Sequence, residues 1–351
     1  MTVGLIAASY AALSLFLALP LGRQIDRRGP KLFFLGGIGG MLAGAGISAL
    51  APTVAMLAMG QAFLGIAQLS TAISFQTITA NRRHSNRDRG FARLAVAASS
   101  GQLVGPLIGG LLLDLPAETF GRFSQTIVVF GVAGLLAAIA LTISVGVDAG
   151  ERPRLPAADG SDDGSPVGSI LRRQGVLPAL TIGITVLTTI DLLIVYLPVL
   201  GETRGISPGV VGMLLSLRAT AGLVSRLTMT VMLRRWGRAP TLTGAMLIAG
   251  IALFAMAVSG LPAVLAVTMA VIGFCLGLGS PMTMAWVSTQ TPRKDRGTVL
   301  AIRMTGNRFS QVLMPGAAGG LATLLGTGAI FVVLSVLLVS GSLWVRRSPL
   351  E

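Results

Sequence analysis

Residues 2–50 read TVGLIAASYAALSLFLALPLGRQIDRRGPKLFFLGGIGGMLAGAGISAL, two long apolar runs separated by a short charged segment. About 20 mainly apolar residues cross the hydrocarbon core of a bilayer as a helix, and the runs at 2–22 and 32–50 have roughly that length. A barrel strand would need only about 10 residues with strict alternation, which these runs lack. The stretch therefore predicts two membrane-spanning helices joined by a tight loop.

The same pattern of apolar runs and short polar breaks continues to the end of the chain. Hydrophobic residues make up 53% of the sequence and charged residues only 11%, whereas soluble domains carry about 25% charged residues. This composition predicts an all-α integral membrane protein. The expected spans are 2–22, 32–50, 53–80, 91–114, 124–146, 176–200, 207–233, 241–259, 262–290, 298–324 and 327–345.

Basic residues predict the orientation of these eleven spans. Lys and Arg together outnumber Asp and Glu by 27 to 13, a balance that by itself also suits nucleic-acid binding. Their positions exclude that function, because most lie in alternate loops while the other loops hold only Arg122 and Arg204. The Arg-rich loops are therefore expected to be cytoplasmic. Trp236, Trp286 and Trp344 fall near the cytoplasmic ends of spans, where interfacial aromatic residues are common.

One long polar segment divides the chain. Residues 147–175 are rich in Asp, Pro, Gly and Ser and predict a flexible cytoplasmic linker between a five-span bundle at 1–146 and a six-span bundle at 176–351. The two halves repeat a pattern. Asp-Arg-Gly at 88–90 precedes Pro106, and Asp-Arg-Gly at 295–297 precedes Pro315. Internal duplication of this kind is typical of transporters.

The loop at 22–31, GRQIDRRGPK, resembles a motif between helices two and three of the major facilitator superfamily. Gly29 permits a tight turn, and Asp26 can accept from a helix N-terminus or an arginine. The resemblance implies that Gly22, Asp26, Arg27 and Gly29 form a latch for one conformer. An ordinary positive-inside turn is the alternative. The corresponding second-half stretch, RRWGR at 234–238, has a basic residue where the acid would be, so only the first copy is expected to latch.

A second stretch, GQLVGPLIGG at 101–110, looks like the helix-five motif of the drug/proton antiporter branch of that family. The motif glycines and proline are Gly101, Gly105, Pro106, Gly109 and Gly110. Gly101, Gly105 and Gly109 share a helix face, which allows a second helix to approach closely, and the proline allows a bend. Close packing without antiport is the alternative.

The resemblance also contains two departures. Gln61 lies where the antiporters carry an arginine on helix four, which puts a proton route through that position in doubt. The first motif follows the first visible span rather than the second. The eleven helices therefore correspond to family helices two to twelve of a two-bundle fold, and helix one is expected to be missing through a truncated gene model or a deletion.

Charged residues inside spans are the remaining functional signal, because each costs at least about 2.5 to 3.5 kcal/mol in hydrocarbon. Asp191 is the one acid deep in a predicted span. A carboxylate removed from water can exchange a proton near neutral pH, so Asp191 is the candidate coupling group. A structural ion pair with Arg218 or Arg303 is the alternative. Arg218, Arg303, Asn307 and Gln61 are the candidates for lining a substrate cavity, whereas Arg226 is expected to reach the cytoplasmic interface.

These observations predict a secondary transporter that exports small solutes by proton-coupled alternating access. The alternatives are transport of a small organic anion, and a membrane sensor or truncated product that moves no solute. One His and one Cys, far apart, argue against an enzyme or a metal site, and no nucleotide-binding loop is present. We expect no cofactor and no nucleic-acid partner. A monomer in a bacterial inner membrane, with a small-molecule substrate and a coupling proton, is the expected form.

Overall fold

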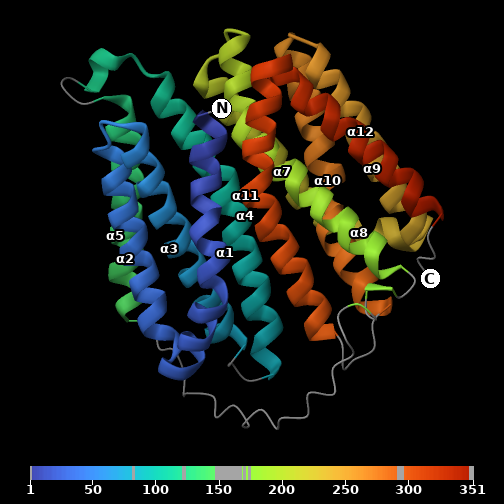
Figure 1. Ribbon diagram of the computed structural model, residues 1–351, viewed down its shortest axis with the longest axis horizontal. Coiled ribbons are helices and arrows are strands. Elements are labelled where there is room, and N and C mark those ends of the chain that lie inside the picture. The colour runs from blue at the N-terminus through green and yellow to red at the C-terminus, as the bar shows by residue number, and fades with distance from the viewer. Residues whose placement is uncertain are drawn as a thin grey trace. The chain divides into compact units, whose positions relative to one another are not determined.

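The computed structural model describes residues 2–80, 84–120, 124–146, 168, 171–172, 175–290 and 296–347. Within these ranges the chain is all-α, without a strand, which confirms the predicted fold class (Figure 1). Nine of the described helices are long and apolar enough to cross a membrane. The α-helices are α1 (Thr2–Arg28), α2 (Pro30–Ala49), α3 (Val54–Ala80), α4 (His84–Asp114), α5 (Gln125–Val145), α7 (Val176–Thr203), α8 (Pro208–Trp236), α9 (Arg238–Val258), α10 (Pro262–Gln290), α11 (Arg296–Leu325) and α12 (Thr327–Arg347).

The two turns that follow α1 and α8 are shorter than the predicted loops. Each helix continues through its charged residues, because polar side chains do not prevent a helix from extending beyond the hydrocarbon. The chain then reverses at one glycine, Gly29 with φ 91° or Gly237 with φ 79°. Side chains rarely adopt such positive φ values, so glycine is the residue that fits both turns. A turn at a glycine with positive φ therefore occurs at corresponding places in the two halves of the sequence.

The chain divides into two compact units. The first contains α1, α2, α3, α5 and both ends of α4, and the second contains α7, α8, α9, α10, α12 and the middle of α4, Gln102–Gly110. Most of α11 belongs to the second unit, and Gln311–Gly316 belongs to the first. The predicted bundles at 1–146 and 176–351 stay a prediction, and the predicted linker lies mostly outside the described residues.

In the first unit, α2 packs against α3 and α5, and α1 packs against α3. A small apolar cluster of Phe34, Ile38 and Ile78 holds α2 to α3. The rings of Phe34 and Phe75 lie 5.6 Å apart in a tilted arrangement that aromatic pairs favour. The closest approach in this unit is at Gly65 of α3, where the absence of a side chain lets the backbone of α1 pass at Tyr10.

In the second unit, α10 packs against α7, α8 and α9, while α12 packs against α9 and α7 (Figure 1). Its core is a large apolar cluster that includes the fully buried Tyr196, Trp286 and Phe331. Glycines bring α8 and α10 together, because a Cβ at Gly273 would overlap the carbonyl oxygen of Arg218. Small residues are the usual means of close helix contact in membranes.

Arg204, one of the two basic residues in the predicted extracytoplasmic loops, has a structural role. It follows α7 and donates hydrogen bonds to three carbonyl oxygens at the end of α9, those of Met256 (2.9 Å), Ala257 (2.6 Å) and Ser259 (2.5 Å). A cation at a helix C-terminus meets the negative end of the helix dipole and satisfies carbonyls that have no partner within the helix. Burial lowers the pKa of Arg204, because removing the guanidinium from water disfavours its charged form.

Candidate substrate and coupling site

Asp191 lies near the middle of α7 with a half-buried side chain. The other acidic residues whose side chains the structure describes lie at helix ends and are exposed; they are Asp114, Glu118 and Glu202. Within that described set, Asp191 is therefore the one carboxylate at mid-membrane depth. Its role as the coupling group stays a prediction.

Arg218 of α8 lies at a similar depth to Asp191. The two helices are joined by the short loop that follows Thr203 and includes Arg204. At about 1.5 Å per residue, Asp191 is about 18 Å and Arg218 about 15 Å from that loop. The side chain of Arg218 is only 7% exposed. A buried guanidinium and a half-buried carboxylate at similar depths are therefore the charged centre of the second unit.

The Arg218 guanidinium has unused hydrogen-bonding capacity. Its Nε is buried and has no hydrogen-bond partner among the described residues. Buried polar groups are satisfied in the great majority of cases, so an unsatisfied donor of this kind needs an explanation. Asn307 of α11 has an unsatisfied acceptor, since its Oδ1 is buried and receives no hydrogen bond within the described part of the chain. These two atoms are available to a polar ligand or to water.

Arg303, by contrast, is held by its neighbours. Its side chain is 3% exposed, and Nη2 donates to the carbonyl oxygen of Ser280 (3.3 Å), to Ser280 Oγ (3.4 Å) and to Thr283 Oγ1 (3.1 Å) on α10. A Cβ at Gly183 of α7 would lie 3.4 Å from Arg303 Nε and Nη2. Three helices, α7, α10 and α11, therefore meet around one guanidinium. These contacts anchor Arg303 to α10, and its predicted place in the lining of a substrate cavity stays a prediction.

Polar contacts continue along α7 and α11. The hydroxyl groups of Thr188 and Ser310 form a hydrogen bond of 2.5 Å, one to two turns beyond the contact between Gly183 and Arg303. Asn307 lies on α11 between these two contacts. The α7–α11 seam, defined by Gly183, Thr188, Arg303, Asn307 and Ser310, is therefore the polar surface inside the second unit.

Adding bulk at Gly183 tests the packing around Arg303. We expect Gly183→Val to destabilise the protein by about 1–3 kcal/mol, because the added methyl groups displace the guanidinium from α10. Gly320→Val is the matched control, since nothing lies within 4 Å of a Cβ at Gly320 on α11. Thermal unfolding of both variants in detergent measures the difference. Equal melting temperatures for the two variants would contradict this description of the seam.

The middle of α4 packs closely against α8 within the second unit. A Cβ at Gly212 would overlap the carbonyl oxygen of Pro106, and a Cβ at Gly110 would lie 2.9 Å from Gly212 Cα. Ser216 Oγ donates to the carbonyl oxygen of Leu103 (2.6 Å). The carbonyl oxygen of Pro106 on α4 therefore lies directly against Gly212 of α8.

This contact differs from the predicted one. Nothing within the described residues lies within 4 Å of a Cβ at Gly101, Gly105 or Gly109, the expected contact face. The contact involves Gly110 instead, because α4 turns toward α8 the face that carries Pro106 and Gly110. Sequence reasoning missed Gly212 and Ser216 as the partners. The closely spaced Gly209 and Gly212 after Pro208 were the signal available for this contact.

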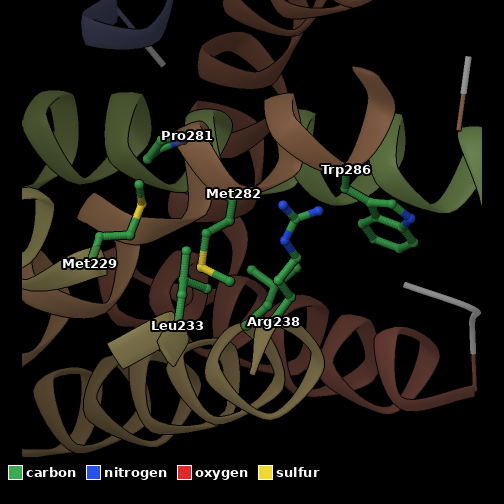
Figure 2. Close-up of a pocket in the computed structure, with 7 residues that line it drawn as sticks. Met229, Leu233, Arg238, Pro281, Met282 and Trp286 are labelled. Atoms are coloured by element: carbon green, nitrogen blue, oxygen red, sulfur yellow. The ribbon is translucent and has the colours of Figure 1, made fainter. Parts of the chain in front are cut away.

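A small cavity lies at the predicted cytoplasmic end of α8, α9 and α10. It has a volume of about 50 Å³ and is lined by Met229, Leu233, Arg238, Leu242, Pro281, Met282 and Trp286. Figure 2 shows the Arg238 guanidinium extending past Met282 toward Trp286. Sites for drug-sized ligands measure about 300–1,000 Å³, so this cavity is too small to hold a substrate.

The sequence profile of the Major Facilitator Superfamily matches residues 1–207 and 179–351, and thus covers the whole chain. The chain belongs to the Major Facilitator Superfamily. Two solved structures share this fold: a mutant of the nucleoside transporter NupG, with TM-score 0.80 and 13% identity, and a D-xylose-proton symporter, with TM-score 0.77 and 16% identity. Each alignment covers 99% of this chain, with 90% of the former and 87% of the latter.

Curated relatives of this superfamily member include efflux proteins. The tetracycline resistance protein of class D from Salmonella ordonez is 30% identical over 32% of this chain, and that of class G from Vibrio anguillarum is 28% identical over 39%. The efflux pump azaK from Aspergillus niger is 24% identical over 51%. These alignments cover 28%, 35% and 38% of the relatives' own lengths, so the chain spans only about a third of each. The similarity confirms the predicted resemblance to drug-efflux members of the superfamily.

The predicted site residues belong to both units, and some of them lie outside the described part of the chain. Gln61 is half-buried on α3 in the first unit, whereas Asp191, Arg218, Arg303 and Asn307 belong to the second. The side chains of Asp26 and Arg27 lie outside the described residues, so the latch stays a prediction. Among the residues that the structure describes, no three or more potential metal ligands lie together.

Proposed function

We propose that this chain is a secondary transporter that exports small amphipathic compounds in exchange for protons. The observation that carries the proposal is the carboxylate of Asp191 near the middle of α7, at a similar depth to the buried Arg218 of α8. Similarity to tetracycline resistance proteins and to a fungal efflux pump supports export as the direction. A bacterial inner membrane and a monomeric state are part of this proposal.

Asp191 is the proposed proton carrier. When its carboxylate is ionised, it offsets part of the charge of Arg218. Protonation removes that compensation and leaves a buried cation, which is costly in hydrocarbon. The protein then favours the conformation in which water reaches the site, and the proton is released there. An exported compound and a proton thus occupy the second unit in alternation.

The substrate contacts proposed for this site are the two unsatisfied groups. Arg218 Nε is a donor and Asn307 Oδ1 an acceptor, both buried, so each can bind the polar part of an amphipathic compound. Pockets of this kind combine apolar walls with a few polar groups that fix orientation. The hydroxyl groups of the α7–α11 seam are already engaged with each other.

Inverted vesicles with an acidic interior test the proposal. We expect vesicles containing the protein to accumulate tetracycline or a fluorescent amphipathic compound, and a protonophore to collapse that accumulation. Vesicles from cells that lack the protein are the control. Accumulation that is unchanged by the protonophore would contradict proton coupling.

A second function rests on the same Arg218 donor. A buried guanidinium with an unused N–H also suits the carboxylate of a small organic anion. Anion transport would be independent of the acidic interior and would be driven by an anion gradient. The vesicle assay separates the two functions, because an imposed pH gradient drives only the proposed exchange.

A further inference from the structure

A large apolar groove lies among α8, α9 and α10, on the second unit. Its volume is about 600 Å³, within the range of ligand sites. Phe274, Cys275 and Leu278 of α10 line one part of it. Side chains of α8 and α9 form the rest, and Thr241 is the one hydroxyl group among the lining side chains. We call this feature the α8–α10 groove.

The groove is open to the surface of the helices. Val224, Ile248 and Trp236, which line it, are 44%, 50% and 54% exposed. In a helix that crosses a membrane, exposed apolar side chains meet lipid chains rather than water. The natural occupant of the groove is therefore an acyl chain, which is long, apolar and present at high concentration around the protein.

One end of the groove is strongly basic. Arg234 and Arg235 are exposed in the last turn of α8, and Arg238 is the exposed first residue of α9. Trp236, between these arginines, lines the groove itself. No Asp or Glu occurs in α8, α9 or α10 to offset the positive charge.

The start of α9 adds to this positive field. Gly237 is its N-cap and supplies no side-chain hydrogen bond, so the first backbone N–H groups of α9 lack a side-chain acceptor. The positive end of a helix dipole stabilises a nearby anion, and phosphate groups bind readily at such ends. An apolar groove and a cationic end therefore meet at Trp236.

We propose that the α8–α10 groove binds an anionic phospholipid of the cytoplasmic leaflet. One acyl chain fills the groove, and the headgroup phosphate lies at Arg234 and Arg235. Basic sites between transmembrane helices on the cytoplasmic side attract anionic lipid headgroups. This inference concerns a lipid on the outside of the bundle, so it stands or falls independently of the exported compound.

Native mass spectrometry of the purified protein tests the headgroup part. The protein is equilibrated with equal amounts of phosphatidylglycerol and phosphatidylcholine that carry identical chains. We expect phosphatidylglycerol to be retained at least about fivefold more often. The double variant R234Q/R235Q should lose this preference, whereas R346Q, which removes an exposed arginine near Trp344, should keep it. Equal retention of the two lipids by the wild-type protein, or an unchanged preference in the double variant, would overturn the proposal.

Gly244→Leu tests the acyl-chain part. Gly244 lines the groove, and nothing lies within 4 Å of a Cβ there, so a leucine enters the groove without meeting its neighbours. We expect this variant to retain less of both lipids. Gly131→Leu on α5 is the control, because a Cβ at exposed Gly131 also meets nothing within 4 Å. Equal lipid retention by the two variants would show that the groove is not the binding site.

Discussion

Asp191→Asn is expected to reduce proton-driven export by about a hundredfold or more, because asparagine cannot carry a proton between the two sides of the membrane. Substrate exchange in the absence of a pH gradient should persist, since asparagine has nearly the same shape and keeps the hydrogen-bonding capacity of the site. Accumulation and exchange in the same vesicle preparation measure both effects.

Glu202→Gln is the matched control for Asp191→Asn. Glu202 is on the same helix, α7, but is exposed at its end, so its loss should leave export unchanged. Asp191→Glu restores a carboxylate and should recover part of the activity. If Asp191→Asn exports as well as the wild-type protein, the carboxylate is a structural partner of Arg218 and not a proton carrier. If export and exchange are lost together, Asp191 serves substrate binding or folding.

Gly65→Ala is expected to destabilise the protein by about 2 kcal/mol or more. The added Cβ would overlap the carbonyl oxygen of Tyr10 on α1, which is backbone and cannot rotate away. The α1 and α3 helices must therefore separate, and overpacking of this kind typically costs about 1–3 kcal/mol. The free energy of unfolding by a denaturing detergent measures the change.

Gly36→Ala on α2 is the control, and we expect it not to destabilise the protein. Gly36 is exposed and a Cβ there meets nothing within 4 Å. Alanine is a better helix former than glycine by about 0.5–1 kcal/mol, so this variant should be as stable as the wild-type protein or more stable. A Gly65→Ala protein with the stability of Gly36→Ala would show that α1 and α3 do not pack as described.

The helices of this fold are predictable from the sequence to within a few residues for most elements. Apolar runs of spanning length admit few other structures in lipid, because each backbone polar group needs a partner inside its own segment. The end of α1 and the start of α4 were the exceptions, since α1 continues through charged residues to Arg28 and α4 begins at His84 rather than at residue 91. Hydropathy predicts which residues lie in the hydrocarbon, but it does not predict where the helix itself ends.

The candidate site was predictable only in part. Asp191 and Arg218 stand out from the sequence because charges inside spans are rare and costly. The contacts of Arg303 could not be predicted, since they depend on which faces of α7, α10 and α11 meet. The contact between Pro106 and Gly212 joins residues on helices far apart in the sequence. Helix periodicity gives the residues that share a face but does not select the partner of that face.

Proton release on substrate binding tests the central proposal most directly. A compound that the vesicle assay identifies as a substrate is added to purified protein in weakly buffered detergent solution, and a pH indicator records the protons released. The wild-type and Glu202→Gln proteins should acidify the solution, whereas Asp191→Asn should bind the compound without a change in pH. Proton release by Asp191→Asn equal to that of the wild-type protein would contradict the assignment of Asp191 as the coupling group.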